Sequence, residues 1–556
     1  MPTIELSKKD LFGLIGKNLT SIQLDEDILL AKGEIEHEEG DIIKVEIADT
    51  NRPDLWSAEG VARDIRTKYG NKKVDYSKLK KSGVIVKVDK NLKNIRPMTV
   101  CAVIRNINIT PDVLSQLIQL QEKVCETFGS KRKEAAIGVY DLHKITSPII
   151  YKAFKPKEIK FIPLEFEQEM DLGMILRRHP KGQEYAHLLE PFDKYPIFID
   201  SVGEVLSMPP VINSNHTGKV TEKTKDLFIE CSGFEMKYIS PALNVIVAAL
   251  ADRGGKIETV EVIYDKKKII TPELKPNKIE VKLSYIEKIT GLKLGSKKII
   301  ELLKKANYNF IKEIKDTLVL EYPAYRQDIM HPIDVVEDVA IRYGYNNFEP
   351  VVPEMYTAQK ILPINVLSKN VANILTGIGS QEIMSYTLNN KDVMITKMNL
   401  KDLKYIEIDN PVSKNWSIFR PWIMPCLIEF FGKNTNKEYP QEIFEIGEVV
   451  LFDKNAQTRT QNPTRIAWSK ADKAADFTIA KQAFDYLMRR LGLEYEMKEE
   501  LHDSFIKGRV GRAYINNKAV AYIGEINPSV LENFGIEMPV CAFELNLTEI
   551  TKEVLK

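Results

Sequence analysis

Four carboxylates gather in the stretch Y-R-Q-D-I-M-H-P-I-D-V-V-E-D-V-A-I-R-Y-G, which runs from residue 325 to residue 344. They are Asp328, Asp334, Glu337 and Asp338. The last three are spaced i, i+3 and i+4, so on a helix they lie together on one face. Like charges this close repel unless a cation or an Arg/Lys cluster neutralises them. An all-oxygen set suits Mg²⁺, which takes one or two carboxylates and keeps several waters. The alternative is an acidic helix start stabilised by the helix dipole.

A helix is needed to hold these carboxylates, and the sequence predicts one that begins near Pro332. Proline suits the first helical turn because its missing N–H is not needed there. Ile333, Val336, Ala340 and Tyr343 follow at helical spacing and predict one apolar face. His331 precedes the proline and is expected to cap the helix.

An earlier segment, T-N-R-P-D-L-W-S-A-E-G-V-A-R-D-I-R-T-K-Y-G, repeats this stretch without a gap. The matched pairs are Arg52 with Arg326, Asp54 with Asp328, Asp64 with Asp338, and Tyr69-Gly70 with Tyr343-Gly344. The order and spacing indicate two copies of one turn-and-helix unit. Gly60 and Arg63 stand where the second copy has Asp334 and Glu337. The first copy therefore lacks the carboxylate cluster, and we expect a structural or binding role for it.

The composition limits the class of protein. The chain has 556 residues, and its 79 basic residues nearly cancel 78 acidic ones, so any RNA contact must be local. Five scattered cysteines without a C-x-x-C pair disfavour a zinc site or disulfide framework and fit a reducing cytosol. The sequence contains no signal-peptide core and no apolar run of membrane-span length. We therefore expect a cytoplasmic protein without a membrane.

The predicted fold is a multidomain α+β protein with four blocks. Residues 1–85 form a small α+β unit, and residues 86–268 form a larger α/β domain. Residues 269–352 contain two short helices and a hairpin, as in a winged helix, although a purely structural module is the favoured alternative. Residues 353–556 read as long strands with few helices, which favours an antiparallel sheet. The run L-S-M-P-P-V-I-N-S-N-H-T within the second block reads as an ordinary loop.

These motifs resemble the β subunits of phenylalanyl-tRNA synthetases in their shorter archaeal/eukaryotic form. The resemblance rests on N-R-P-D-L-W-S-A-E-G-V-A-R-D-I, on the carboxylate run, on G-E-I-N-P-S-V-L-E-N-F-G-I, and on the order of the four blocks. It implies an α₂β₂ enzyme that charges tRNA(Phe), with ATP and phenylalanine bound on the α subunit. It also implies a B3/B4-like editing domain, a B5-like domain, and a class II synthetase-like domain. Mg²⁺ is implied at Asp328, Asp334, Glu337 and Asp338, in a structural or subunit-interface role.

The sequence independently indicates that the last domain has lost aminoacylation chemistry. Class II chemistry needs an arginine on a late strand, because a guanidinium fork matches phosphate oxygens. The last arginine here is Arg512, and the expected strand V-C-A-F-E-L-N-L carries Glu544 instead. An anion at that position would repel a nucleotide. Arg420 reads as a remnant ahead of a helix. We expect the isolated chain not to activate amino acid.

The resemblance places an editing pocket in the second block, where tyrosine wrongly attached to tRNA(Phe) is hydrolysed. Its residues are Ser207, Asn213, Glu230 and Ser232, with Phe198 as the floor. For each of these residues, a structural hydrogen bond or core contact is the alternative. No Cys/His or Ser/His/Asp set accompanies them, which favours water positioned by the tRNA. Two other classes stay open: a standalone editing hydrolase or nucleic-acid-binding module, and a Mg²⁺-dependent phosphoryl-transfer enzyme. The last is disfavoured because no Gly-rich phosphate loop is present.

Overall fold

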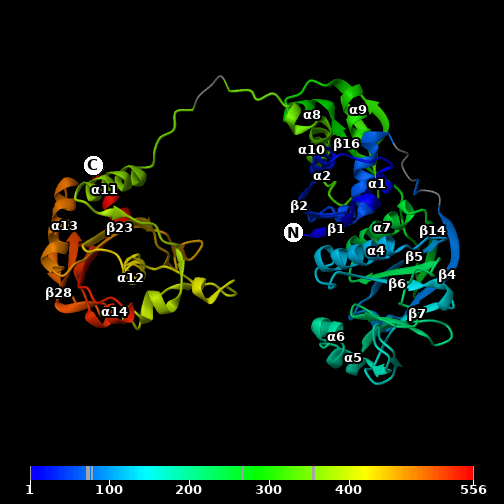
Figure 1. Ribbon diagram of the computed structural model, residues 1–556, viewed down its shortest axis with the longest axis horizontal. Coiled ribbons are helices and arrows are strands. Elements are labelled where there is room, and N and C mark those ends of the chain that lie inside the picture. The colour runs from blue at the N-terminus through cyan, green and yellow to red at the C-terminus, as the bar shows by residue number, and fades with distance from the viewer. Residues whose placement is uncertain (1, 71–74, 77–78, 266, 354–356, 555–556) are drawn as a thin grey trace. The chain divides into compact units, whose positions relative to one another are not determined.

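The computed structural model describes residues 2–70, 75–76, 79–265, 267–353 and 357–554. The chain divides into two compact units, residues 1–351 and 352–556, which are both visible in Figure 1. Within the described residues, none of the helices has the length and apolar character needed to cross a membrane.

The first unit begins with a three-stranded antiparallel sheet in the order β1-β3-β2, covered by three helices. The elements are β1 (Thr3–Ser7), α1 (Lys8–Ile15), α2 (Ser21–Leu30), β2 (Gly33–Glu39), β3 (Ile42–Ile47) and α3 (Ala58–Ile65). Local signals set the helix starts: Ser7 accepts from the Asp10 N–H, and Thr20 forms a capping box with Gln23. Every residue of α3 is buried.

A ten-stranded sheet forms the centre of the first unit, in the order β12-β11-β10-β7-β4-β14-β5-β13-β6 with β15 beside β14. Its strands are β4 (Lys80–Val88), β5 (Met98–Arg105), β6 (Ala135–Asp141), β7 (Ile149–Phe154), β10 (Tyr195–Ile199), β11 (Val205–Met208), β12 (Ile212–Asn213), β13 (Leu227–Gly233), β14 (Lys256–Tyr264) and β15 (Lys267–Thr271). The expected α/β sheet is mainly antiparallel, since only β4 pairs in parallel, with β14 and with β7. A small appendage holds β8 (Lys160–Phe161), β9 (Met170–Asp171), α5 (Leu172–Arg178) and α6 (Pro180–Tyr185).

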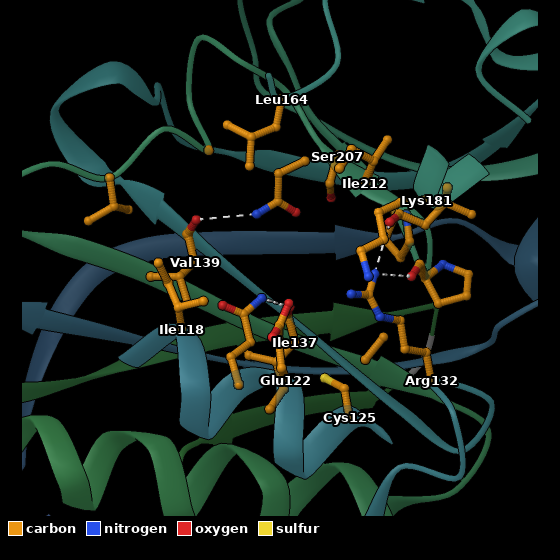
Figure 2. Close-up of a pocket in the computed structure, with 18 of the residues that line it drawn as sticks. Ile118, Glu122, Cys125, Arg132, Ile137, Val139, Leu164, Lys181, Ser207 and Ile212 are labelled. Carbon is orange, nitrogen blue, oxygen red and sulfur yellow. Dashed lines mark hydrogen bonds between the residues drawn. The ribbon is translucent and has the colours of Figure 1, made fainter. Parts of the chain in front are cut away.

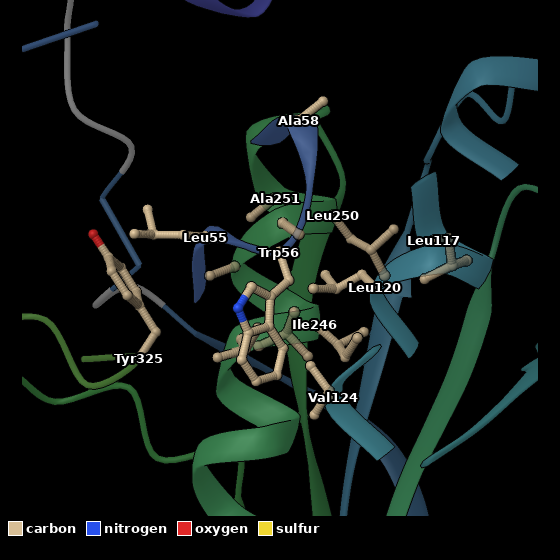
Figure 3. Packing of buried hydrophobic residues seen from close by; sticks show 14 of the residues in the cluster. Leu55, Trp56, Ala58, Leu117, Leu120, Val124, Ile246, Leu250, Ala251 and Tyr325 are labelled. Atoms are coloured by element: carbon tan, nitrogen blue, oxygen red, sulfur yellow. The ribbon is translucent and has the colours of Figure 1, made fainter. Parts of the chain in front are cut away.

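Two helices, α4 (Pro111–Lys123) and α7 (Met236–Asp252), pack on this sheet. Figure 3 shows Trp56, just before α3, inserted among residues of α7 and α4 such as Ile246, Leu250 and Leu120. The indole is fully buried, so the turn before α3 is anchored to the central core. Burial of a side chain this large contributes on the order of 2–3 kcal/mol.

The last part of the first unit has two helices followed by a hairpin, which confirms those predicted elements. They are β16 (Asn277–Lys282), α8 (Leu283–Thr290), α9 (Gly295–Lys305), β17 (Asn309–Ile314), β18 (Thr317–Tyr322) and α10 (Pro332–Tyr343). The predicted start of α10 is confirmed, since His331 accepts from the Ile333 N–H and Asp334 completes a capping box.

The second unit is built on a seven-stranded sheet in the order β19-β23-β26-β30-β29-β28-β27. Its main elements are α11 (Pro363–Gly377), β19 (Gln381–Glu382), α12 (Met424–Lys433), β23 (Gln441–Glu448), β26 (Thr464–Ala471), α13 (Phe477–Arg490), β27 (Glu496–Glu499), β28 (Phe505–Ile515), β29 (Lys518–Ile526), α14 (Pro528–Asn533), β30 (Val540–Asn546) and α15 (Leu547–Val554). Helices α11, α13 and α15 pack on one face, and α12 and α14 pack on the other. All pairs except β19 with β23 are antiparallel, which confirms the predicted antiparallel sheet.

The sequence pattern predicts one strand of the second unit over residues 382–388, and this prediction is wrong. Its ends belong to two sheets, β19 in the large one and β20 (Leu388–Asn389) beside β22 (Ile418–Phe419). Between them Met384 and Tyr386 are exposed, so the apolar alternation that indicated a strand faces no core. Periodicity alone does not reveal whether a second layer is present.

Candidate functional site

A cavity of about 370 Å³ lies where the central sheet curls and brings its edge strands β6 and β12 together. Its walls come from α4, from β6 and from the hairpin of β11 and β12 (Figure 2). Glu230 on β13 also lines it. Contact between the edges is direct, because Asn213 Nδ2 donates to the Val139 carbonyl at 3.4 Å. The run L-S-M-P-P-V-I-N, which the sequence predicted to be an ordinary loop, consists of the end of β11, a tight turn and β12, and it forms a wall of the cavity.

Glu230 is the buried carboxyl group of this cavity, at 2 % exposed, whereas Glu122 and Glu165 in the lining are exposed. It lies on β13 between β5 and β6, and its Oε1 accepts from the Tyr140 hydroxyl at 3.1 Å. Its Oε2 is buried and has no hydrogen-bond partner among the described residues. Burial raises the pKa of Glu230 to about 8, although Arg96 and the hydroxyls of Tyr140 and Ser232 oppose the shift. The carboxyl is therefore mainly neutral at pH 7 and can both donate and accept a hydrogen bond.

Tyr140 joins three of the expected residues, although sequence reasoning did not single it out. Its hydroxyl lies 2.7 Å from Ser207 Oγ, 3.1 Å from Glu230 Oε1 and 3.4 Å from Asn213 Oδ1. Gly138 leaves room for it, because a Cβ there would lie 2.1 Å from the Tyr140 oxygen and 2.7 Å from Glu230 Oε1. The sequence prediction did not include strand β6, which carries both Gly138 and Tyr140. No predicted element therefore placed Tyr140 near the other residues of the cavity.

The five residues of the expected editing pocket fall into two groups. Ser207, Asn213 and Glu230 line the cavity together. Ser232 is fully buried and accepts from Arg96 Nε at 3.0 Å, outside the cavity wall. Phe198 is also fully buried and stacks on Tyr151 at 4.1 Å between centroids, one strand in from Ser207. Ser232 and Phe198 thus support the wall from behind and do not form its surface.

A strained turn brings Arg132 to the cavity. Ser130, Lys131 and Arg132 all have positive φ, at 52°, 52° and 64°. Each such non-glycine residue costs about 1–2 kcal/mol. Arg132 Nη1 donates to the carbonyls of Pro210 and Val211, at 3.2 and 2.9 Å, as Figure 2 shows. Sequence patterns gave no indication of this residue, because backbone strain is not visible in composition or periodicity.

The four carboxylates of the opening stretch do not meet at one point. Asp328 and Asp338 are buried around Arg326, which contacts Asp328 Oδ1 through Nε at 2.7 Å and Asp338 Oδ2 through Nη2 at 2.9 Å. Tyr308 also donates to Asp338, at 2.8 Å. Asp334, Glu337 and Asp338 lie on the predicted helix α10, but Asp338 is buried against Arg326 and does not group with the other two.

Asp334 and Glu337 lie toward the surface of α10. Asp334 Oδ2 accepts from the backbone N–H groups of Met330 and His331, at 2.8 and 2.6 Å. Glu337 is exposed, and its Oε2 accepts from Lys32 at 3.0 Å. In the described part of the chain, no three His, Cys, Asp or Glu side chains are grouped to hold a metal ion. A four-carboxylate Mg²⁺ site does not fit this arrangement, and Asp334 and Glu337 are the two of the four carboxylates that lie toward the surface.

A second cavity, of about 310 Å³, lies on the sheet of the second unit beside α12. Glu544 in its wall is not a bare anion, since it accepts from Arg465 Nη1 at 2.9 Å and from the Met424 N–H at 2.8 Å. Arg465 offsets the charge of Glu544, and the expectation that Glu544 repels a nucleotide stays a prediction. Arg420 is buried, and its Nη1 donates to Glu445 at 2.6 Å, so it is not available to a ligand.

Three family models match the chain in order. They are "B3/4 domain" at residues 83–246, "tRNA synthetase B5 domain" at residues 279–345 and "Phenylalanyl tRNA synthetase beta chain CLM domain" at residues 349–547. The first model includes the cavity with Glu230, and the second includes the carboxylate stretch.

Known proteins match over the whole chain. The phenylalanine–tRNA ligase beta subunit of Pyrococcus abyssi is 47% identical and covers 98% of this chain and 99% of its own length. That of Methanocaldococcus jannaschii is 38% identical and covers 98% and 100%. The crystal structure of an N-terminal fragment of the phenylalanyl-tRNA synthetase beta subunit from Pyrococcus horikoshii is 48% identical, with a TM-score of 0.60. It covers 62% of this chain and 100% of the fragment.

Proposed function

The chain belongs to the family of phenylalanine–tRNA ligase beta subunits, and we propose that its first unit hydrolyses tyrosine wrongly attached to tRNA(Phe). Members of this family are subunits of an aminoacyl-tRNA synthetase, a ligase of protein biosynthesis. A phenylalanine site must reject a substrate with one extra hydroxyl, and an apolar pocket does so only about a hundredfold. A second, polar site that recognises the hydroxyl removes the remaining errors.

The observation that carries this proposal is the unpartnered Oε2 of Glu230 in the wall of the cavity. A buried polar atom without a partner costs about 1–3 kcal/mol, which a phenolic hydroxyl regains on binding. Tyr140, Ser207 and Asn213 hold the other side of the carboxyl network, so Glu230 keeps a fixed orientation. Phenylalanine offers no hydroxyl to this site and leaves Oε2 unsatisfied.

The hydrolytic step uses water and no covalent intermediate in this proposal. The cavity lining contains Cys125, but burial raises the pKa of its thiol to about 11, so little thiolate forms at pH 7. Ser207 contacts the Tyr140 hydroxyl and has no histidine base among its hydrogen-bond partners in the described residues. Attack by water breaks the ester bond between the tyrosyl carbonyl and the ribose oxygen, and releases tyrosine and free tRNA.

Substitution of Glu230 tests the proposal in the complex with an α subunit. Glu230→Ala is expected to lower kcat/KM for Tyr-tRNA(Phe) hydrolysis about 10- to 100-fold, since it removes the partner of the hydroxyl. Glu230→Gln is the matched control, because it keeps the shape and a donor and is expected to retain most activity. Hydrolysis by Glu230→Ala at the unaltered rate would refute the assignment.

The name of the relatives implies an alpha partner, and we propose the α₂β₂ assembly with ATP and phenylalanine bound on that partner. The second unit then has a class II synthetase-like fold without its chemistry, which is consistent with Arg420 being occupied by Glu445. The native mass of the chain co-expressed with an α chain tests the assembly, and a lone monomer would favour a standalone hydrolase. ATP–pyrophosphate exchange by the isolated chain would contradict the loss of chemistry.

Magnesium at the carboxylate stretch stays a prediction, centred on Asp334 and Glu337. These two carboxylates are accessible, while Asp328 and Asp338 are neutralised by Arg326. Metal content of the purified complex is expected to fall in the Asp334→Asn/Glu337→Gln double variant and to persist in Lys32→Gln. A cytoplasmic location is likewise proposed, from the reduced cysteines and the activity.

A further inference from the structure

The cavity of the first unit has chemically different ends. At one end are the neutral carboxyl of Glu230 and the hydroxyls that hold it. At the other are two cations beside one aromatic ring: the Arg132 guanidinium lies 4.3 Å and Lys181 Nζ 5.7 Å from the centroid of Tyr185. Figure 2 places Arg132 and Lys181 on the same side of the cavity. The Glu230 end fits a phenol, and the cationic end fits an anion.

The side chain of Arg132 is fixed by its surroundings before any ligand binds. Tyr185 is fully buried and donates to Glu126, so the ring beneath the guanidinium is anchored. Nη1 is engaged by the carbonyls of Pro210 and Val211, which belong to the turn opposite. A guanidinium held in this way loses little side-chain freedom when it binds an anion.

The edge of the guanidinium formed by Nε and Nη2 is not used by the protein. Nε is buried without a partner, and Nη2 makes no hydrogen bond with the described residues. In Arg52 this same edge grips the two oxygens of Asp54, at 2.9 and 3.0 Å. Arg132 lines the cavity, so Nη2 is the nitrogen left to bind a carboxylate or phosphate there, and the enclosed Nε joins it in two parallel hydrogen bonds only after a shift of the side chain.

The backbone at Ser130–Arg132 is strained, because all three residues have positive φ, and the surrounding contacts hold it in this conformation. Lys131 and Arg132 donate their N–H groups back to the carbonyls of Glu126 and Cys125, at 2.9 Å each. Gly129 before them leaves no room for a Cβ, which would lie 2.3 Å from the Ala135 carbonyl oxygen. Three successive left-handed residues persist only where the surrounding structure enforces them, and such strain is concentrated at ligand sites.

We propose that Arg132 forms a phosphate subsite of this cavity and holds the phosphodiester next to the 3′-terminal nucleotide of the RNA substrate. The choice of ligand rests on the proposed editing function. The amino acid's own carboxyl is esterified in that substrate and carries no charge, so phosphate is the anion within reach. Lys181 lies at the same end, but its Nζ is paired with Glu184 at 3.0 Å, so the subsite depends on the guanidinium of Arg132.

Binding of AMP and adenosine to the full-length chain, measured by calorimetry, tests the subsite, because the two probes differ only in the phosphate. AMP is expected to bind about tenfold or more tightly than adenosine, from one charge-assisted contact. Arg132→Gln is expected to remove this difference and leave adenosine affinity unchanged. Arg132→Lys retains part of it, since the charge remains but the fork is lost.

Lys131→Gln is the matched control, since it removes one positive charge from the same left-handed turn at an exposed residue outside the cavity lining. It is expected to leave the AMP preference intact. The salt dependence of AMP binding should weaken in Arg132→Gln and not in Lys131→Gln, a difference that simple loss of stability does not produce.

Three results would overturn the phosphate subsite. The first is equal affinity of the unaltered chain for AMP and adenosine, and the second is a preference for AMP that survives Arg132→Gln. The third is that Arg132→Gln abolishes binding of free tyrosine but leaves binding of AMP unchanged. The last would assign Arg132 to a carboxylate. If the complex did not hydrolyse Tyr-tRNA(Phe) but the chain still preferred AMP in an Arg132-dependent way, the proposed reaction would be refuted and the phosphate subsite would stand. Failure of the proposed reaction and failure of the subsite are therefore distinguishable.

Discussion

The two copies of the R-x-D turn and helix hold their aspartates in the same way but differ in what surrounds them. In the first copy Arg52 grips Asp54 through Nε and Nη2, and in the second Arg326 grips Asp328 through the same atoms. Each arginine also lies near an aspartate on its helix, Asp64 at 3.7 Å and Asp338 at 2.9 Å. The sequence repeat is thus a repeat of side-chain contacts.

The copies face each other and share these charges. Arg52 Nε lies 3.7 Å from Asp328 Oδ1, and Arg342 of the second copy donates to Asp64 of the first. All of these side chains are at least nine-tenths buried. The network therefore joins the start of the chain to residues almost three hundred positions later. Loss of one partner leaves a buried charge without compensation.

The difference lies at the two positions where the second copy has Asp334 and Glu337. A Cβ at Gly60 would lie 1.7 Å from the Asp54 carbonyl oxygen, so no aspartate fits there. Arg63, the counterpart of Glu337, points inward and donates to Asp252 at 2.6 Å. The helix of the first copy is buried throughout, whereas the helix of the second copy leaves Asp334 and Glu337 accessible to a cation or partner.

The largest expected effect is that of Arg326→Met. It leaves Asp328 and Asp338 buried without their cation, at a cost of about 3–5 kcal/mol. Arg52→Met is the matched variant in the first copy and should cost less, because only Asp54 is in close contact. Urea unfolding of both variants measures the difference. If Arg52→Met lost as much free energy of unfolding as Arg326→Met or more, Arg326 would not contribute more to the stability of the network than Arg52.

The stability of the network should fall at acid pH in a defined window. Burial alone would raise the pKa of Asp328, but Arg52 and Arg326 outweigh it and hold that pKa at about 2. The unfolded carboxyl titrates near pH 3.9, so about 2–3 kcal/mol is present above pH 4 and is lost as pH falls toward 2. Unfolding midpoints of the unaltered chain and Asp328→Asn, measured from pH 5 to pH 2, should approach each other as the pH falls. Parallel curves would contradict this linkage.

The equivalent positions Gly60 and Asp334 should respond to alanine for different reasons. Gly60→Ala forces the helix away from the turn and is expected to cost about 1–3 kcal/mol. Asp334→Ala removes only the Asp334 half of the capping box of α10, while His331 remains, at about 1 kcal/mol. Thermal unfolding ranks the two. A neutral Gly60→Ala would mean that the first copy packs more loosely than the Asp54 contact indicates.

The smallest expected effect is that of Glu337→Gln. Its salt bridge with Lys32 is half exposed at the carboxylate, and such pairs contribute less than about 1 kcal/mol. The same variant is expected to matter for metal content and assembly with the α chain. A large loss of stability in the isolated chain would assign Glu337 a structural role that its exposure does not support.

The sequence alone determined much of this protein. Local signals set most helices, because caps such as Thr20 with Gln23 act within four residues. The repeat predicted the shared scaffold, and the motif at residues 51–65 carried the family resemblance. Glu230, Ser207 and Asn213 came from that resemblance and do meet in one cavity.

Only the tertiary structure decided which side chains meet. Arg326 draws Asp338 inward although helical spacing placed it beside Glu337, because a buried guanidinium must be neutralised by its neighbours. Closure of the sheet brings Tyr140 to Ser207, which lie on strands 67 positions apart. The strain that aims Arg132 into the cavity depends on how Gly129 packs against Ala135. Residue types set local conformation, but long-range packing fixed the electrostatic partners on which both sites depend.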